Sequence, residues 1–434
     1  MNEIKEKILK LSAEYTKLKH LSNDAFIPGL TSIPVSGKVF DESDISSLIE
    51  SSLDFWLTTG RFNDQFEDIL KKFIGTRFTL TVNSGSSANL VAFSSLTSHL
   101  LKDKKLKSGD EVITVAAGFP TTINPILQHG LIPIFIDVNI PTYNINTDLI
   151  EAAITEKTKA IVIAHTLGNA FNIAKILEIC KEYNLFLMED CCDALGTTYN
   201  GQHVGTFGNV STLSFYPAHH ITMGEGGAVF MNDSNIKRAA ESIRDWGRDC
   251  YCAPGIDNTC GKRFHQKLGD LPFGYDHKYT YSHLGYNLKI TDMQASVGVS
   301  QMQHLPKFIN ARKKNFELLS KGLENLQDYF ILPKATENSD PSWFGFPITI
   351  KNNTKFSRLD LMLYLNEKKI GTRLIFAGNL TKQPYMMDRN FRIASSLENT
   401  DIIMNDSFWI GVAPCINEEM IEYVVKCFKE FCEK

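Results

Sequence analysis

The sequence predicts an α/β protein with a large domain built on a mainly parallel, helix-covered sheet and a smaller α+β domain at the C-terminus. Two observations support this prediction. From about residue 77 onward, short apolar runs alternate with amphipathic helical segments, which is the pattern of βαβ units. The 434 residues are 43% hydrophobic and 22% charged, which suits a folded chain of two or three domains and excludes wholesale disorder.

The first 50 residues are predicted to form an N-terminal helical extension. Residues 1–25 have the polar amphipathic pattern of a helix that lies on the body of the protein. Residues 43–73 contain two helical apolar stripes, and these break at Thr58, Thr59 and Gly60.

The large domain is predicted over residues 51–300. Its strands are expected at FTLTVNS, EVITVAA, PIFIDV, AIVIAHT, LFLMED and GGAVFM, with helices at SANLVAFSSLTSHLL, PTTINPILQHG and AKILEICKEYN. The apolar strands are typical of a sheet that is buried on both faces. Residues 250–285 are rich in Gly, Asp and Cys, so we expect a loop inserted into this domain.

The C-terminal domain is predicted over residues 301–434. A helix comes first, followed by a strand at PSWFGFPITI, a helix at SRLDLMLYLNEKK and a last helix at NEEMIEYVVKCFKEFC. Strands and helices in this order indicate an α+β unit.

Composition and charge exclude several classes of function. The net charge is −4 and no basic run occurs, which argues against nucleic acid as a partner. No apolar segment approaches the ~18 residues that a membrane span needs, and no signal-peptide core follows the N-terminus. We therefore expect a cytoplasmic protein, in which nine cysteines indicate metal or redox chemistry rather than disulfides.

Three segments have residue types suited to chemistry. Residues 83–89, NSGSSAN, join a strand to a helix with small residues, so backbone N–H groups could bind a phosphate. Asp190 ends an apolar strand, where open α/β sheets bind ligands. His219 and His220 precede the Gly-rich turn at 224–227. Each segment also has a structural explanation: a Ser-capped helix, an Asp N-cap, or a packed histidine.

Taken together, these segments closely resemble the sugar-aminotransferase branch of the fold-type-I pyridoxal-phosphate enzymes, which act on nucleotide-linked keto sugars. The resemblance runs from about Phe40 to the C-terminus and includes DEVI at 110–113, FIDV at 135–138 and GYNLK at 285–289. It implies a seven-stranded sheet and a homodimer in which Asn287 reaches the neighbouring subunit's cofactor phosphate. The residues that it implies for cofactor binding are Gly85, Ser86, Phe119, Asp190, Ser214 and Asn287.

The departures from this family are informative. His219 stands where ordinary members have the lysine that binds the cofactor covalently. Imidazole cannot make that bond, but it can move a proton near neutral pH. Asp193 and Tyr216 also depart from the aminotransferase pattern. A histidine at this position resembles the 3-dehydrase subgroup, whose members keep the cofactor as pyridoxamine 5′-phosphate. The resemblance implies His219 as the base, and Asp190 as the carboxylate beside the pyridine nitrogen.

Four cysteines divide the subgroup further. Cys192, Cys250, Cys252 and Cys260 form the pattern C-x57-C-x-C-x7-C, which resembles the [2Fe–2S] ligand set of the CDP-4-keto-6-deoxyglucose 3-dehydrases. Four thiolates are what such a cluster needs. Structural zinc is the alternative, although zinc sites usually contain C-x2–4-C pairs, and the C-x-C step fits them poorly.

The resemblance thus implies a cytoplasmic 3-dehydrase that depends on pyridoxamine phosphate and an iron–sulfur cluster. Its substrate would be CDP-4-keto-6-deoxy-D-glucose, on the route to 3,6-dideoxyhexoses of the lipopolysaccharide O-antigen. A flavin and iron–sulfur, NADH-dependent reductase would supply the electrons.

Three alternatives remain open on the sequence. The chain could be a pyridoxal-phosphate-dependent nucleotide-sugar aminotransferase in which His219 is structural. It could be a dehydrase of a dTDP- or GDP-linked sugar, because the CDP preference comes from overall resemblance and not from a motif. The third alternative is a non-catalytic, zinc-bound scaffold.

Overall fold

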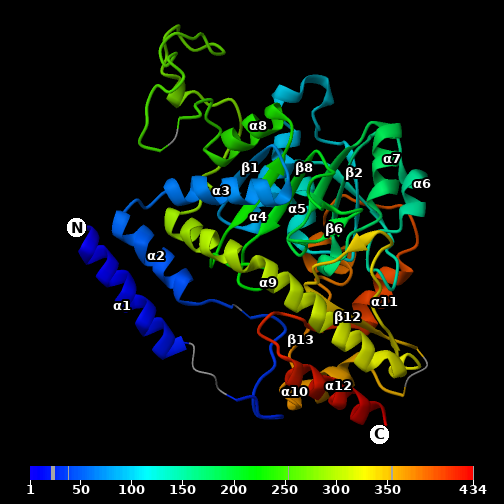
Figure 1. The fold of residues 1–434 in the computed structure, drawn as a ribbon. Coiled ribbons are helices and arrows are strands. Elements are labelled where there is room, and N and C mark those ends of the chain that lie inside the picture. The colour runs from blue at the N-terminus through cyan, green and yellow to red at the C-terminus, as the bar shows by residue number, and fades with distance from the viewer. Residues whose placement is uncertain (21–24, 38, 253, 353–354, 434) are drawn as a thin grey trace.

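The structure is a computed structural model that describes residues 1–20, 25–37, 39–252, 254–352 and 355–433 (Figure 1). Its α-helices are α1 (Asn2–His20), α2 (Glu42–Asp54), α3 (Arg61–Ile74), α4 (Gly85–Leu96), α5 (Pro120–Gln128), α6 (Ile150–Ala153), α7 (Ile173–Tyr183), α8 (Ser234–Arg244), α9 (Asp292–Leu323), α10 (Arg358–Glu367), α11 (Glu398–Asp406) and α12 (Glu418–Cys432). The strands are β1 (Phe78–Val82), β2 (Glu111–Val115), β3 (Ile132–Ile136), β4 (Thr158–Ala164), β5 (Phe186–Asp190), β6 (Thr198–Tyr199), β7 (Gln202–His203), β8 (Val210–Ser214), β9 (Gly227–Met231), β10 (Phe330–Ile331), β11 (Ser339–Asp340), β12 (Gly345–Ile350), β13 (Thr372–Leu374), β14 (Arg392–Ile393) and β15 (Ser407–Gly411).

The central sheet has the strand order β1-β9-β8-β5-β4-β2-β3-β14. All of its pairings are parallel except those of β9, which runs antiparallel to β1 and β8. This confirms the predicted α/β class. The sheet has eight strands where seven were expected. The extra strand, β14, is only two residues long and has no apolar run that could reveal it, so its pairing with β3 comes from tertiary contacts.

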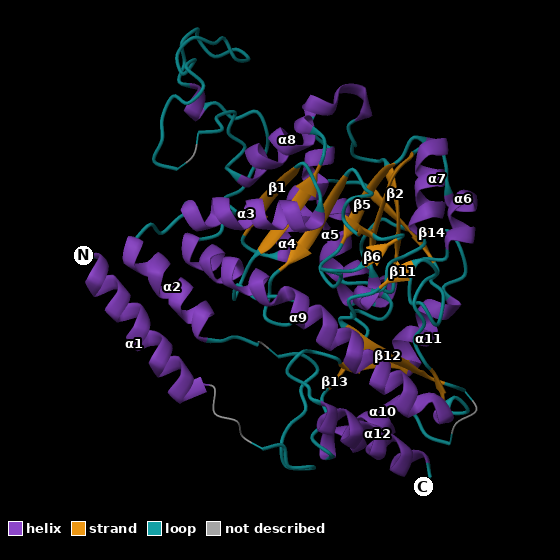
Figure 2. Cartoon of the chain, viewed as in Figure 1, coloured by secondary structure: helices purple, strands orange, loops and turns teal. Residues whose placement is uncertain are grey.

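Helices cover both faces of this sheet (Figure 2). On one face α4, α5 and α8 contribute Phe93, Ile126 and Ile243 to a buried cluster. On the other face α3 and α9 contribute Phe66 and Leu305 to a second cluster. The strands between them are almost entirely buried, as expected for apolar strands in a helix-covered sheet.

The C-terminal sheet is antiparallel, with the order β10-β12-β15-β13, and it packs against α10 and α12. Helix α9 joins the two cores, because Ala295 and Val299 lie in the core of the large sheet while Leu319 and Leu323 lie in that of the small sheet. The helix begins at Asp292, after a capping box formed by Thr291, so residue 301 lies inside it.

Two segments lie outside these layers. Helix α1 packs on α2, and α2 packs on α9. Residues 250–285 project from the body beside α8 (Figure 1) and contain one short 3-10 turn, His277–Tyr279, among their described residues. Of the helices that the structure describes, none is long and apolar enough to cross a membrane.

Candidate functional site

The site is built where strands of the central sheet end, and its first part is the start of α4. Ser84 caps this helix by accepting a hydrogen bond from the Ser87 N–H at 3.0 Å. A Cβ on Gly85 would lie 2.4 Å from Cβ of Ser214, so only glycine allows β8 to approach the helix this closely. Ser86 is exposed in the first turn. The free N–H groups and the small residues form a cradle that suits a phosphate.

Asp190 is held at the end of β5 by hydrogen bonds to both carboxylate oxygens. Oδ2 accepts from Nδ2 of Asn89 at 2.8 Å and from the hydroxyl of Thr122 at 2.6 Å, while Oδ1 accepts the Cys192 N–H at 3.1 Å. Asn89 is fixed in turn by the hydroxyl of Thr212. Because Oδ1 has one protein donor and can accept a further one, the carboxylate can still bind an N–H group from a ligand.

His219 lies in the turn between β8 and β9, with its side chain facing Asp193. Its Nδ1 is 3.3 Å from the carbonyl oxygen of Tyr216, so this nitrogen is the N–H donor. Its Nε2 lies 3.5 Å from Oδ1 of Asp193 and is therefore the nitrogen that can take up a proton. A negative charge on Asp193 would stabilise the resulting imidazolium.

The surroundings of Asp193 shift the pKa of its carboxyl group. Burial raises the pKa of Asp193, and the neighbouring His219 and Arg312 oppose that rise. The ring of Phe344 packs against the His219 imidazole, with 5.3 Å between the centroids. His219 therefore has both an acidic partner and an aromatic wall.

Arg312 of α9 fixes the backbone of the same turn. Its Nη2 donates to the His219 carbonyl oxygen at 3.2 Å, and its Nη1 donates to the carbonyl oxygens of Trp343 and Phe344. The side chain is 1% exposed. Arg312 thus ties the turn to the start of the C-terminal sheet.

His220 faces away from this site. Its Nε2 donates to the Ser342 carbonyl oxygen at 2.7 Å, and burial, with Arg312 nearby, lowers its pKa well below the ordinary value. Because the N–H group of His220 is already bonded to the Ser342 carbonyl oxygen, the geometry favours His219 as the base.

The two remaining predicted cofactor contacts are exposed. Phe119 is 51% exposed at the start of α5, with Phe376 edge-on at 6.2 Å, so its ring has surface available for stacking. Asn287 is exposed, while the neighbouring Leu288 accepts the Asn83 N–H at 2.8 Å. The Asn287 segment therefore lies beside the phosphate cradle of its own chain.

The four predicted cluster ligands are divided between two places. Cys192 lies beside the start of α4, with its sulfur 3.2 Å from the position of a Gly85 Cβ. Cys250, Cys252 and Cys260 are neighbours in the projecting loop. There, Thr259 donates to Cys252 at 3.2 Å, and hydrogen bonding outweighs burial to lower the pKa of Cys252.

This arrangement does not assemble a four-thiolate ligand set. Among the described residues, three potential ligand atoms converge only at His165, Glu189 and Cys191 and at Asp41, Asp44 and His304. At the first group, Glu189 already accepts hydrogen bonds from Gly205, Phe207 and Gly208. In this arrangement the four cysteine thiols therefore do not form a ready cluster site.

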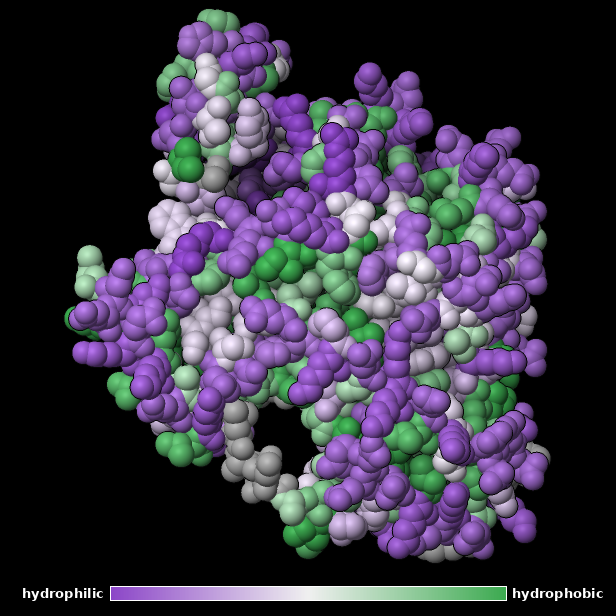
Figure 3. All heavy atoms as spheres, in the orientation of Figure 1, coloured by the Kyte–Doolittle hydropathy of each residue, from purple (hydrophilic) through white to green (hydrophobic). Residues whose placement is uncertain are grey.

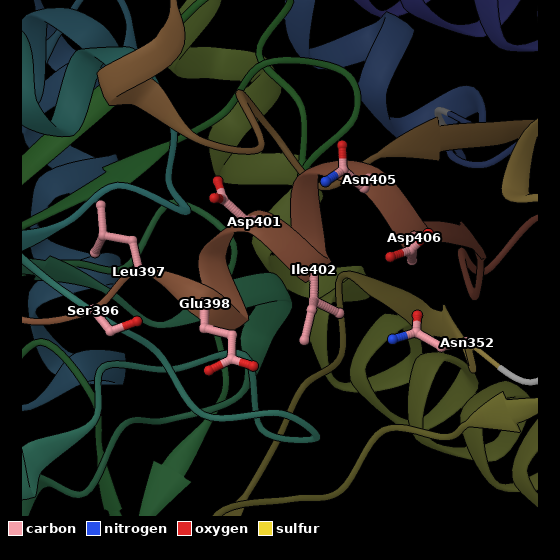
Figure 4. A pocket seen from close by; sticks show the side chains of 8 residues that line it. All are labelled: Asn352, Ser396, Leu397, Glu398, Asp401, Ile402, Asn405 and Asp406. Atoms are coloured by element: carbon pink, nitrogen blue, oxygen red, sulfur yellow. The ribbon is translucent and has the colours of Figure 1, made fainter.

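A surface pocket of about 470 Å³ lies elsewhere, along α11. None of the predicted site residues lines it; its lining residues are Asn352, Ser396, Leu397, Glu398, Asp401, Ile402, Asn405 and Asp406. Figure 4 shows most of these side chains on α11 or just before it, with Asn352 on a separate segment, and they do not converge on one point. Three carboxylates make this pocket a poor site for a phosphate-bearing ligand.

Pyridoxamine phosphate fits the residues gathered at this end of the central sheet. The start of α4 suits its phosphate, and Asp190 has an oxygen available for its protonated ring nitrogen. Oδ1 of Asn83, beside the cradle, is buried without a hydrogen-bond partner in the described protein, so a ligand could satisfy it. His219 has a nitrogen free to exchange a proton.

Sequence reasoning included Asn89 only as the end of the 83–89 segment, gave Thr122 no role, and missed Arg312. The first two lie in helices that begin at predicted cofactor contacts, one turn after Gly85 and three residues after Phe119. A polar residue on the buried side of each helix was a usable signal. Arg312 had none, because its partners are backbone carbonyls far away in the sequence.

Comparison with known proteins agrees with this geometry. The model of the DegT/DnrJ/EryC1/StrS aminotransferase family matches residues 39–429. The chain is 60% identical to the lipopolysaccharide biosynthesis protein RfbH of Salmonella typhimurium, over 99% of this chain and 98% of that protein. It is 51% identical to a dTDP-4-dehydro-2,6-dideoxy-D-glucose 3-dehydratase of Saccharopolyspora spinosa, over 100% of this chain and 93% of that protein.

Among solved structures, the fold is similar to that of the GDP-4-keto-6-deoxy-D-mannose-3-dehydratase of E. coli with bound hydrated PLP. The TM-score is 0.82 at 27% identity, covering 91% of this chain and 98% of that one. The chain belongs to the DegT/DnrJ/EryC1/StrS aminotransferase family.

Proposed function

We propose that this protein is a pyridoxamine-phosphate-dependent 3-dehydrase, which removes the C3 hydroxyl of CDP-4-keto-6-deoxy-D-glucose in the synthesis of 3,6-dideoxyhexoses for the O-antigen. The observation that carries the proposal is His219. It occupies the position of the covalent lysine in this family, and its Nε2 is directed at Asp193. A residue that can move a proton but cannot bind the cofactor covalently suits deoxygenation better than aminotransfer.

Each residue of the candidate site would have a role in this reaction. The start of α4, with Gly85, Ser86 and Ser214, would bind the cofactor phosphate, and Phe119 would flank the ring. When bound, pyridoxamine phosphate supplies an amine that condenses with the sugar's C4 ketone and a ring that withdraws electrons. Asp190 would keep the ring nitrogen protonated. His219 would take the proton from the cofactor's C4′ carbon, while Asp193 stabilises the charge that His219 gains.

Two substitutions of His219 test this proposal. His219→Asn should slow exchange of the C4′ proton by about 10²–10⁴-fold with little effect on cofactor affinity, because no base remains at that atom. His219→Lys should bind pyridoxal phosphate covalently, as measured by intact mass after borohydride reduction, and should lose dehydration. Wild-type dehydration by His219→Asn would refute the assignment.

The competing aminotransferase function is tested with the wild-type chain. Incubation with a 4-keto sugar nucleotide and glutamate should give no amino sugar, as measured by mass spectrometry. Appearance of an amino sugar at the rate of dehydration would favour the aminotransferase.

We further propose that Cys192, Cys250, Cys252 and Cys260 hold a [2Fe–2S] cluster. Such a cluster would pass single electrons from a flavin and iron–sulfur, NADH-dependent reductase. The three loop thiols already lie near one another, and the lowered pKa of Cys252 favours the thiolate form that iron requires. Binding would draw these thiols and Cys192 together.

Anaerobic preparation with iron and acid-labile sulfide quantified, together with an EPR spectrum, tests the cluster. Cys250→Ser should lose iron, whereas Cys432→Ser, which changes a cysteine at the end of α12, should retain it. Full iron content in Cys250→Ser, or zinc without sulfide in the wild type, would contradict the cluster.

The same proposal includes the nucleotide of the substrate, the oligomeric state and the cellular location. We expect CDP to be preferred over dTDP and GDP, in a cytoplasmic homodimer. Its sites would be shared through Asn287, which is exposed beside the cradle of its own chain and would contact the partner's cofactor phosphate across the interface. The 51% identity to a dTDP-sugar 3-dehydratase makes dTDP the main competitor. Comparison of kcat/KM for the matched 4-keto sugars decides between them, and a fully active monomer would contradict the shared site.

A further inference from the structure

Helix α1 has two distinct apolar faces, and only one of them is covered. The covered face packs on α2 through Leu9, Ala13 and Thr16, of which Thr16 is fully buried. Salt bridges from Lys5 to Glu50 and from Lys17 to Glu42, both at 2.9 Å, hold the helix in this orientation. The orientation of the second face is therefore fixed.

The second face carries a regular stripe of large apolar side chains, Ile4, Ile8, Leu11, Tyr15 and Leu18, which we call the α1 stripe. These residues are between 36% and 84% exposed. Figure 3 shows apolar side chains at the surface along α1, at the left of the view. Their spacings of 4, 3, 4 and 3 residues repeat every 3.5 residues on average, which is the spacing of a helix that pairs with another helix.

We propose that the α1 stripe is an interface between two copies of this chain, in which it packs against the α1 stripe of the second copy. Stripes with this spacing place side chains from one helix between those of the other. Because Leu11 is the middle residue of the stripe, it would face its own counterpart whether the two helices run parallel or antiparallel.

The charges around the stripe favour a second copy over a membrane. Lys7 and Glu14 flank it on one side, and Lys19 on the other. Opposite charges within one helix allow Glu14 of one copy to pair with a lysine of the other. A helix that binds an anionic membrane surface instead has a polar face dominated by Lys and Arg, whereas α1 also has Glu3, Glu6 and Glu14.

The helix is also additional to the enzyme body. The family match begins at residue 39, after the end of α1 at His20. The stripe touches none of the site residues, so this proposal does not depend on the reaction. Pairing through α1 would add to whatever contacts the shared enzyme body makes.

Disulfide cross-linking of the full chain tests the pairing directly. Leu11→Cys places a thiol at the middle of the stripe, and Lys10→Cys places one on the polar face of the same helix. The first native cysteine is Cys180, so a disulfide between two N-terminal peptides can be assigned by peptide mapping. We expect mild oxidation to link two copies through position 11 at least tenfold faster than through position 10.

A second measurement uses association instead of cross-linking. Ile8→Asp combined with Leu11→Asp should raise the dissociation constant for self-association at least tenfold in sedimentation velocity. Glu6→Gln on the polar face should leave it unchanged. Because the stripe is exposed within one copy, the double variant should keep the wild-type circular dichroism and dehydration at saturating concentration.

Three outcomes would overturn the proposed pairing of α1 stripes. Equal cross-linking through positions 10 and 11 would overturn the proposal, as would unchanged association of the double variant. Binding of the wild type, but not of the double variant, to anionic vesicles without self-association would replace the second copy with a membrane.

Discussion

Arg312 buries a guanidinium group with no carboxylate within ion-pair distance among the described residues. Its hydrogen bonds go to three backbone carbonyls, and burial lowers its pKa to about 10. Such a buried charge is costly unless it is well bonded. These hydrogen bonds fix the position of the His219 peptide, and with it the position of the imidazole ring.

We therefore predict that Arg312→Met destabilises the protein by about 2–4 kcal/mol, because three buried carbonyls lose their donor. It should also slow C4′ proton exchange more than it weakens cofactor binding. Arg312→Lys should recover part of the rate, since an ammonium group can still reach some of these oxygens. Urea unfolding and exchange rates measure both effects, and an unchanged exchange rate in Arg312→Met would exclude a positioning role.

In the proposed reaction, Asp190 acts through its charge. In Asp190→Asn, the neighbours Asn89 and Thr122 would still hold the side chain, but the bond to a protonated ring nitrogen would lose its charge assistance. We predict a fall of at least a hundredfold in C4′ proton exchange, with a change of less than tenfold in substrate affinity. Single-turnover exchange and equilibrium titration separate the two, and Asp190→Glu serves as the charge-conserving control.

At the scale of elements, the phosphate cradle at the start of α4 depends on the close approach of this helix to β8. Alanine is favoured over glycine in a helix by roughly 1 kcal/mol, but a Cβ at Gly85 would lie 2.4 Å from Cβ of Ser214. We predict that Gly85→Ala weakens cofactor binding at least tenfold because the cradle must open. Because Ser214 is itself proposed to bind the phosphate, the comparison is made in two backgrounds: Gly85→Ala should weaken binding less in a Ser214→Gly chain than in the wild type, as measured by fluorescence titration. An equal loss in both backgrounds would show that the clash is not the cause.

Predictability also differed between elements. Apolar runs such as EVITVAA and LFLMED predicted β2 and β5. The break in the apolar helical pattern at Thr58–Gly60 predicted the gap between α2 and α3. Asp190 was proposed because the end of β5 could be located. His219 was proposed because it precedes the Gly-rich turn and stands at the lysine position of the family, since no strand was predicted at β8. β14 and the contacts of Arg312 were not found, because they depend on partners far away in the chain, and no local pattern encodes them.

At the scale of the whole molecule, His283 links global stability to pH. Its ring lies between the hydroxyls of Ser98 and Ser242 and stacks on His99. Burial, with a smaller contribution from His99, lowers its pKa from 6.5 to about 4. Between these values the unfolded chain binds a proton that the folded chain does not, so the free energy of unfolding falls as the pH decreases from 6.5 to 4.

We predict that this histidine accounts for roughly 2 kcal/mol of that fall, after allowing for solvent screening. His283→Gln should have a flatter dependence of stability on pH over this range, measured by urea unfolding. His265→Gln, which changes an exposed histidine, is the matched control. Parallel profiles for wild type and His283→Gln would refute the linkage.

The strand β14 has a consequence for synthesis on the ribosome. It covers the edge of β3, and Arg392 binds Glu111 at 2.9 Å and the carbonyl of Ala153 at 2.8 Å. At roughly 5–20 residues per second, translation delivers Arg392 on the order of ten to fifty seconds after Ile136. During that time the nascent sheet has an unprotected edge, so nascent chains that stall before residue 392 should be especially prone to aggregate and to need a chaperone.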